Sequence, residues 1–175
     1  MTPGDALRAA LVVLAAAMLQ VVIVSSLTVL GGTADLLLVT VCCLGLLRGA
    51  VVGAVAGFGA GLVVDVLTLD TLGASSLVLT LVGFWAGRYG ETTARGTRLP
   101  PLVAVGALTI LAAVFATFLR VLLGEEVVAE HALVGALVPA LVLNLALALP
   151  VSSLLRTVVR PRSESPSAAE VELVA

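Results

Sequence analysis

The sequence predicts an all-α integral membrane protein, a polytopic bundle of about six transmembrane helices. Two observations predict this class: 61% of the 175 residues are hydrophobic, and the mean hydropathy is +1.24. Only 11% of the residues are charged, whereas soluble domains carry about 25%. A soluble core of this size cannot bury so much apolar surface. Soluble enzymes, nucleic-acid-binding proteins and disordered regulators are therefore excluded.

Six apolar segments are candidates to cross a bilayer, which takes about 20 helical residues. The first is longer than the apolar core of a signal peptide, so we expect it to remain as an uncleaved span. The second is the shortest, so a re-entrant segment in a bundle of five helices is an alternative to a sixth span. Transmembrane strands are excluded, because no alternating pattern of about ten residues recurs. The predicted spans, within a single domain of residues 1–160, are about 7–30, 34–48, 49–67, 72–88, 102–123 and 133–155.

The arginines predict the orientation of this bundle. With six spans and the N-terminus inside, eight of the nine basic residues are cytoplasmic, and Arg120 lies near the outer face. Asp35 and Asp70 then fall in short outer loops. This asymmetry is the one that the positive-inside rule describes. We expect a cytoplasmic C-terminus, an N-terminus on the same side, and a disordered cytoplasmic tail over residues 161–175.

The most informative segment is residues 48–88. A glycine recurs there every four residues, and an aspartate continues the series: Gly49, Gly53, Gly57, Gly61 and Asp65. At about 3.6 residues per turn these positions share one helix face. Glycines in phase form a groove in which a second helix can approach backbone to backbone, and such close contact favours helix association in lipid. Two interpretations are open: the groove packs against another helix of this bundle, or it docks a helix of another membrane protein.

Asp65 lies about 24 Å along the helix from Gly49, near the outer end of its span. An acid costs less there than at the bilayer midplane. It could contact outer water, bond the turn that follows, contact a partner protein, or bond within the bundle. Proton or ion coupling is a further alternative, although one acid without a second nearby makes a poor relay. The candidate bonding partners within the bundle are Ser75, Ser76, Thr80, Arg120 and Asn144.

The remaining polar groups predict no chemistry. The two cysteines, Cys42 and Cys43, are adjacent in an apolar run and indicate neither a disulfide framework nor a metal site. No Ser/His/Asp set, HExxH motif or phosphate-binding loop is present. We therefore expect no catalytic residue, no cofactor and no metal, and the net charge of -2 indicates no nucleic-acid partner. Interhelical hydrogen bonds are expected from the polar residues within the spans, Gln20, Thr109, Thr117, Arg120 and Asn144.

A motif extends beyond the glycine series. Its parts are Arg48-Gly49, the run that ends in Asp65, the pair Leu72-Gly73, and the stretch from Leu77 to Gly83. In this order the parts resemble the rod shape-determining protein MreD family, over about a quarter of the chain. Two departures are Thr71, where the family often has proline, and Phe84-Trp85, where a tyrosine is common.

The resemblance implies a non-enzymatic inner-membrane scaffold subunit of the bacterial cell-elongation machinery, which supports rod shape and lateral peptidoglycan synthesis. Its implied partners are membrane lipid, an MreC-like bitopic protein and, as one complex, an MreB-like cytoskeleton and peptidoglycan synthases. Family members also resemble the six-helix substrate-binding subunits of vitamin transporters, so a small-solute-binding transporter subunit is the alternative function. Such a subunit needs converging polar and aromatic groups, and the six aromatic residues of this chain are scattered along it.

Overall fold

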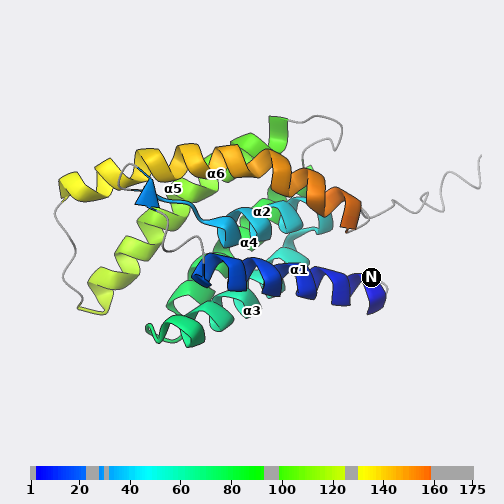
Figure 1. Cartoon of the computed structure of the whole chain (residues 1–175), viewed down its shortest axis with the longest axis horizontal. Helices are drawn as coiled ribbons and strands as arrows, with labels where there is room; N and C mark the ends of the chain where they lie inside the picture. The colour runs from blue at the N-terminus through cyan, green and yellow to red at the C-terminus, as the bar shows by residue number, and fades with distance from the viewer. Residues whose placement is uncertain (1–2, 23–27, 30–31, 93–98, 125–129, 159–175) are drawn as a thin grey trace, which may run out of the picture.

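Six α-helices make up most of the part of the chain that the structure, a computed structural model, describes (Figure 1). That part comprises residues 3–22, 28–29, 32–92, 99–124 and 130–158. The helices confirm the predicted all-α class. The predicted disordered tail, residues 161–175, lies outside the described residues.

Helix α1 (Pro3–Val22) is shorter at its C-terminal end than the first predicted span, which runs to residue 30. It is followed by a small antiparallel strand pair, β1 (Thr28–Val29) and β2 (Gly32–Thr33). Hydropathy does not distinguish an apolar helix from an apolar extended segment, and β-branched residues such as Thr28 and Val29 favour the extended form. The pair has two residues in each strand and does not form a transmembrane sheet.

Helix α2 (Leu36–Arg48) is the core helix of the bundle. Its 13 residues span about 20 Å, less than the ~30 Å of a bilayer's hydrocarbon core. Every residue from Leu37 to Gly45 is buried, and α2 contacts all five other described helices. A helix that is apolar on every side is stable in such a position. The shortest apolar segment is thus surrounded by protein.

Helices α3 (Ala50–Thr68) and α4 (Ala74–Thr92) form an antiparallel pair beside α2. Gly49 separates α2 from α3 with φ +95°, a backbone conformation that favours glycine. Its N–H donates to the Gly45 carbonyl oxygen at 2.7 Å and so ends α2. Because one residue joins the two helices, the start of α3 is held close to the end of α2.

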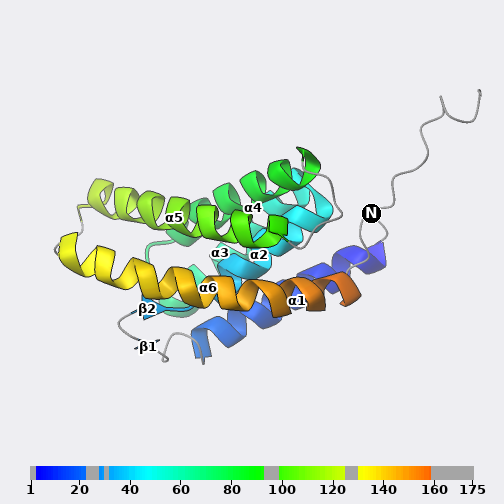
Figure 2. The same ribbon diagram turned by 90° about the horizontal axis from the view of Figure 1, so that it is seen from above.

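Helices α5 (Leu99–Leu122) and α6 (Glu130–Val158) run side by side (Figures 1 and 2). Pro100 and Pro101 lie in the first turn of α5, where a missing N–H breaks no helical bond. Pro139 and Pro150 lie inside α6, where membrane helices tolerate proline. The start of α1 and the end of α6 lie at the same end of the bundle in both views.

Four of the described helices are long and apolar enough to cross a membrane, over Gly4–Val22, Ala50–Thr68, Leu102–Leu122 and Gly135–Val158. Helix α4 has 19 residues, but Arg88 and Glu91 near its end make it more polar. These helices indicate a multi-pass membrane protein. The count of six spans stays a prediction.

Candidate functional site

The glycine series of α3 lies against the backbone of α4. A methyl group on Gly57 would overlap with the Leu79 carbonyl oxygen, and Gly61 is equally close to the backbone of α4. Gly53 faces Gly83, so the two helices touch through glycine on both sides. Close backbone contact of this kind is the geometry expected of in-phase glycines in a membrane. Helix α4 therefore fills the groove that the sequence predicts.

Small residues continue this contact toward α2. Gly87 of α4 faces Ala50 at the start of α3, and Gly45 of α2 faces Gly83 of α4. Three helices thus meet at positions where a larger side chain would overlap with backbone. Of the two interpretations of the stripe, packing inside the bundle is the arrangement in the structure. A partner's helix would need a different face, because α4 already covers this one.

Asp65 lies at the far end of the same interface and is fully buried. Its Oδ2 accepts a hydrogen bond from the Gly73 N–H at 2.8 Å, and its Oδ1 accepts one from the Ser75 N–H at 3.2 Å. Both donors lie at the start of α4, where backbone N–H groups have no partner within the helix. A carboxylate is favourable there because it faces the positive end of the helix dipole. Asp65 therefore bonds the turn that follows it, one of the five roles that the sequence left open.

One of the five candidate bonding partners of Asp65 forms a hydrogen bond with it. Ser75 contacts it, through its backbone N–H. The hydrogen bonds and ion pairs of the described residues do not join Asp65 to Ser76, Thr80, Arg120 or Asn144.

Glu91 acts at the opposite end of the α3–α4 pair. Its Oε1 accepts a hydrogen bond from the Ala50 N–H at 3.0 Å, the first residue of α3. Its Oε2 lies 3.3 Å from Arg88 Nη1. Gly49 makes room for this carboxylate, because a side chain at Gly49 would crowd Glu91 Oε1. Each helix of the pair is thus capped by an acid from the end of the other.

The role of Glu91 was not predicted from the sequence. The available signal was that Glu91 lies near the C-terminal end of α4, and that α3, which runs antiparallel to it, begins directly after Gly49. Recognising it required knowing that α3 and α4 pair along their whole length.

The other motif residues differ in their surroundings. Gly73 has φ +97°, in the turn that leads into α4, and this conformation favours glycine. Gly83 belongs to the α3–α4 contact described above. Leu72 is 69% exposed, so its side chain adds little to the packing of the described bundle.

Polar side chains from three helices hold the start of α2. Asn144 of α6 accepts a hydrogen bond from the Asp35 N–H at 2.7 Å and donates one to the Thr109 hydroxyl of α5 at 3.2 Å. Gln20 of α1 accepts one from the Leu36 N–H at 2.8 Å. Asp35 itself is the N-cap of α2. Because lipid offers no hydrogen bonds, these side chains satisfy N–H groups that would otherwise be unpaired.

Two predicted interhelical groups act differently. The Thr117 hydroxyl donates to the Ala113 carbonyl oxygen at 2.8 Å, within its own helix. Arg120 lines a cavity, which is described below.

Arg48 lies inside the bundle and not in a solvated loop. Its side chain is only 7% exposed, and its Nη2 lies 3.6 Å from Asp5 Oδ2 at the start of α1. A cation at the C-terminal end of α2 is also favourable for the helix dipole. The Arg48-Gly49 element of the motif thus forms a buried junction between α1, α2 and α3.

A wide apolar groove of about 560 Å³ runs between α1 and α3. Its walls combine valine and leucine side chains with small residues on both sides, which include Ala6, Ala10 and Ala17 from α1 and Ala56, Gly59 and Ala60 from α3. Apart from the neighbouring backbone of α3 and the two adjacent residues, no heavy atom lies within 4 Å of the point where a side chain of Gly59 would begin. The groove therefore has room for the side chains of another molecule.

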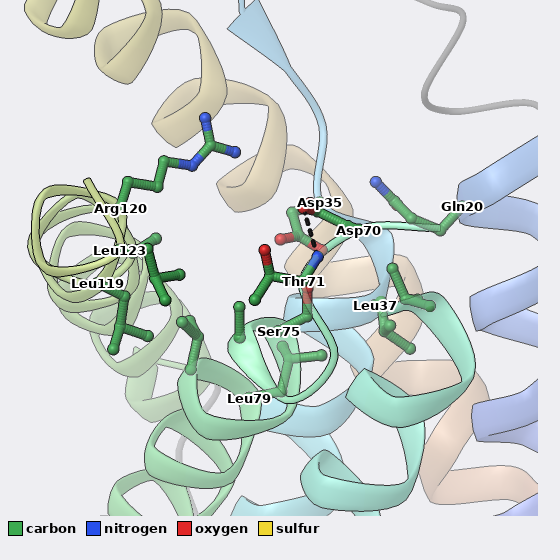
Figure 3. Close-up of a pocket in the computed structure, with 14 residues that line it drawn as sticks. Gln20, Asp35, Leu37, Asp70, Thr71, Ser75, Leu79, Leu119, Arg120 and Leu123 are labelled. Carbon is green, nitrogen blue, oxygen red and sulfur yellow. Dashed lines mark hydrogen bonds between the residues drawn. The ribbon is translucent and has the colours of Figure 1, made fainter. Parts of the chain in front are cut away.

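A smaller cavity of about 220 Å³ lies where the α3–α4 turn meets the C-terminal ends of α1 and α5 (Figure 3). Arg120 lies on one side of it, and Asp35 and Asp70 lie on the other. The described residues that line it include no aromatic side chain. Its lining combines charged groups with leucine and valine.

Metal-binding residues do not gather in the part of the chain that the structure describes, where no group of three His, Cys, Asp or Glu could hold an ion. Cys42 and Cys43 are buried and free.

Comparison with known proteins gives one family. The family model of the rod shape-determining protein MreD matches residues 5–160. The matched range contains α2 to α6 entirely and nearly all of α1. No curated protein and no solved structure matches the chain.

Proposed function

Because the chain belongs to the rod shape-determining protein MreD family, we propose that it is a non-enzymatic scaffold subunit of the bacterial cell-elongation machinery. It supports cell shape and lateral peptidoglycan synthesis by holding partner membrane proteins through helix–helix contacts. Its direct partner is an MreC-like bitopic protein. An MreB-like cytoskeleton and peptidoglycan synthases join it in the same complex.

The observation that carries this proposal is the groove between α1 and α3. Small residues on both walls allow a third helix to approach closely, and this contact replaces the hydrophobic driving force that lipid removes. From Ala6 to Ala17 the groove follows α1 for about 17 Å, or about three helical turns. That length is about half of the ~30 Å that a transmembrane helix crosses, so the groove would hold one half of the single transmembrane helix of a bitopic protein. The proposed occupant is the helix of the MreC-like partner.

Replacing Gly59 by leucine should block this contact. The new side chain has open space within the chain, so the protein should fold and reach the membrane at its normal level. Its side chain would project into the groove and hold the partner's helix away. We expect at least a tenfold loss of the MreC-like protein in co-purification, and rounded cells.

The matched control is Gly135→Leu. Gly135 is also a helical glycine with open space around it, but it lies on α6, outside the groove. It should retain the partner. If Gly59→Leu co-purifies with as much partner as Gly135→Leu does, the groove is not the contact.

The solute-binding alternative has one observation in its favour, the cavity of about 220 Å³. Ligand sites usually enclose about 300–1,000 Å³ and are rich in aromatic side chains. The cavity is smaller than this, and the described residues that line it are not aromatic. We therefore retain the scaffold as the proposed function.

We propose that both chain ends face the cytoplasm. The common position of the start of α1 and the end of α6 supports this orientation (Figure 2), as does the positive-inside rule. Fluorescent reporters fused after Arg98 and after Arg162 should be active in the cytoplasm. A phosphatase reporter near Glu130 should be active outside, and an external signal from residues 88–101 would contradict the proposal.

A further inference from the structure

Charges of opposite sign line the smaller cavity from separate elements. Arg120 extends from α5, and Asp35 and Asp70 lie across from it (Figure 3). Among the described residues no ion pair joins Arg120 to either acid. Asp35 is committed to α2, whose Leu38 N–H donates to its Oδ1 at 2.8 Å. Asp70 is exposed and receives its hydrogen bond from the adjacent Thr71 N–H at 2.7 Å, so one of its carboxylate oxygens is available to a ligand.

Apolar side chains form the rest of the wall. Val64 and Val78 come from the α3–α4 pair, and Leu119 and Leu123 come from the end of α5. Because α1, α3 and α5 all end near the cavity, it lies at the membrane–water boundary of these helices. A molecule with a charged head and a hydrocarbon tail matches such a wall.

The charged residues that line the cavity determine which kind of charged headgroup it can bind. The exposed carboxylate of Asp70 repels a ligand that carries only negative charge, and a ligand that carries only positive charge leaves Arg120 without a partner. A zwitterion satisfies both sides. A primary ammonium can donate hydrogen bonds to the free oxygen of Asp70, and a phosphate accepts charge-assisted hydrogen bonds from a guanidinium.

We infer that this cavity binds the headgroup of a phosphatidylethanolamine-type lipid, with its ammonium beside Asp70 and its phosphate beside Arg120. The acyl chains lie along the leucines of α5. The volume of about 220 Å³ accommodates a headgroup and not a whole lipid. This binding is separate from the scaffold role, because the α1–α3 groove and the cavity are lined by different residues.

Native mass spectrometry of the full chain in detergent tests the inference. Phosphatidylethanolamine, phosphatidylcholine and phosphatidylglycerol with the same acyl chains are added in turn, and so is free phosphoethanolamine. Phosphatidylethanolamine should be retained best, since the quaternary ammonium of phosphatidylcholine donates no hydrogen bond and phosphatidylglycerol lacks a cation. Asp70→Asn and Arg120→Gln should each lower its retention about tenfold. Both side chains are exposed, so neither change should alter folding.

Two further variants sharpen the test. Ala116→Leu fills the apolar part of the cavity without changing charge, and it should also lower retention. Arg88→Gln removes an exposed cation far from the cavity, and it should leave retention unchanged. Equal retention of phosphatidylglycerol, or unchanged retention in both charge variants, would overturn the inference. Binding of free phosphoethanolamine as tight as that of the lipid would overturn the assignment to a membrane lipid.

Discussion

Gly57→Ala is expected to lower the free energy of unfolding by more than about 3 kcal/mol, the upper end of the usual cost of overpacking. The added methyl group would overlap with the Leu79 carbonyl oxygen and its neighbours, which are backbone atoms of α4. Backbone in a packed helix pair cannot move aside as the end of a long side chain can. The two helices would have to separate. Thermal unfolding in detergent, followed by the loss of the monodisperse peak in size-exclusion chromatography, measures the effect.

Gly59→Ala is the matched control, because it makes the same change two residues away on the same helix. Gly59 has open space around it, and alanine is the better helix former by about 1 kcal/mol. This variant should therefore be as stable as the original protein or slightly more stable. Equal midpoints for the two alanine variants would mean that α4 does not pack on the glycine stripe.

Asp65→Asn should destabilise the α3–α4 pair by about 1–3 kcal/mol, the cost of leaving a buried N–H group without a partner. Asparagine keeps the shape of the side chain but offers one acceptor oxygen, whereas the carboxylate accepts from both Gly73 and Ser75. The NH₂ group of the asparagine would face the N–H of Gly73 or of Ser75, so two hydrogen-bond donors would oppose each other. The expected result is a lower thermal midpoint and less protein in the membrane.

Glu91→Gln provides the comparison at the other end of the pair. The Glu91 side chain is 34% exposed, so water can replace a lost hydrogen bond and the effect should be near 1 kcal/mol or less, as for ordinary helix caps. If Asp65→Asn instead keeps its stability and membrane level but loses the MreC-like partner, Asp65 acts in partner contact and its capping role is minor.

Features that depend on neighbouring residues could be predicted from the sequence. Helix content follows from long apolar runs, and the shared face of Gly53, Gly57 and Gly61 follows from the helical period. The position of Asp65 at one end of α3 follows in the same way. Contacts between segments that are far apart in the sequence could not be predicted in this way. Glu91 is 41 residues from Ala50, and Asn144 is 109 residues from Asp35.

Hydropathy and periodicity are local properties of the chain, so the order of its residues is enough to predict an all-α membrane bundle with a glycine face on one helix. The folded arrangement is needed to show that α4 fills this face, that the short α2 is the core, and that Asp65 and Glu91 cap opposite helices. These outcomes depend on which elements pack together. In lipid, where hydrophobicity does not distinguish one helix neighbour from another, close packing and hydrogen bonding across the bundle make that choice.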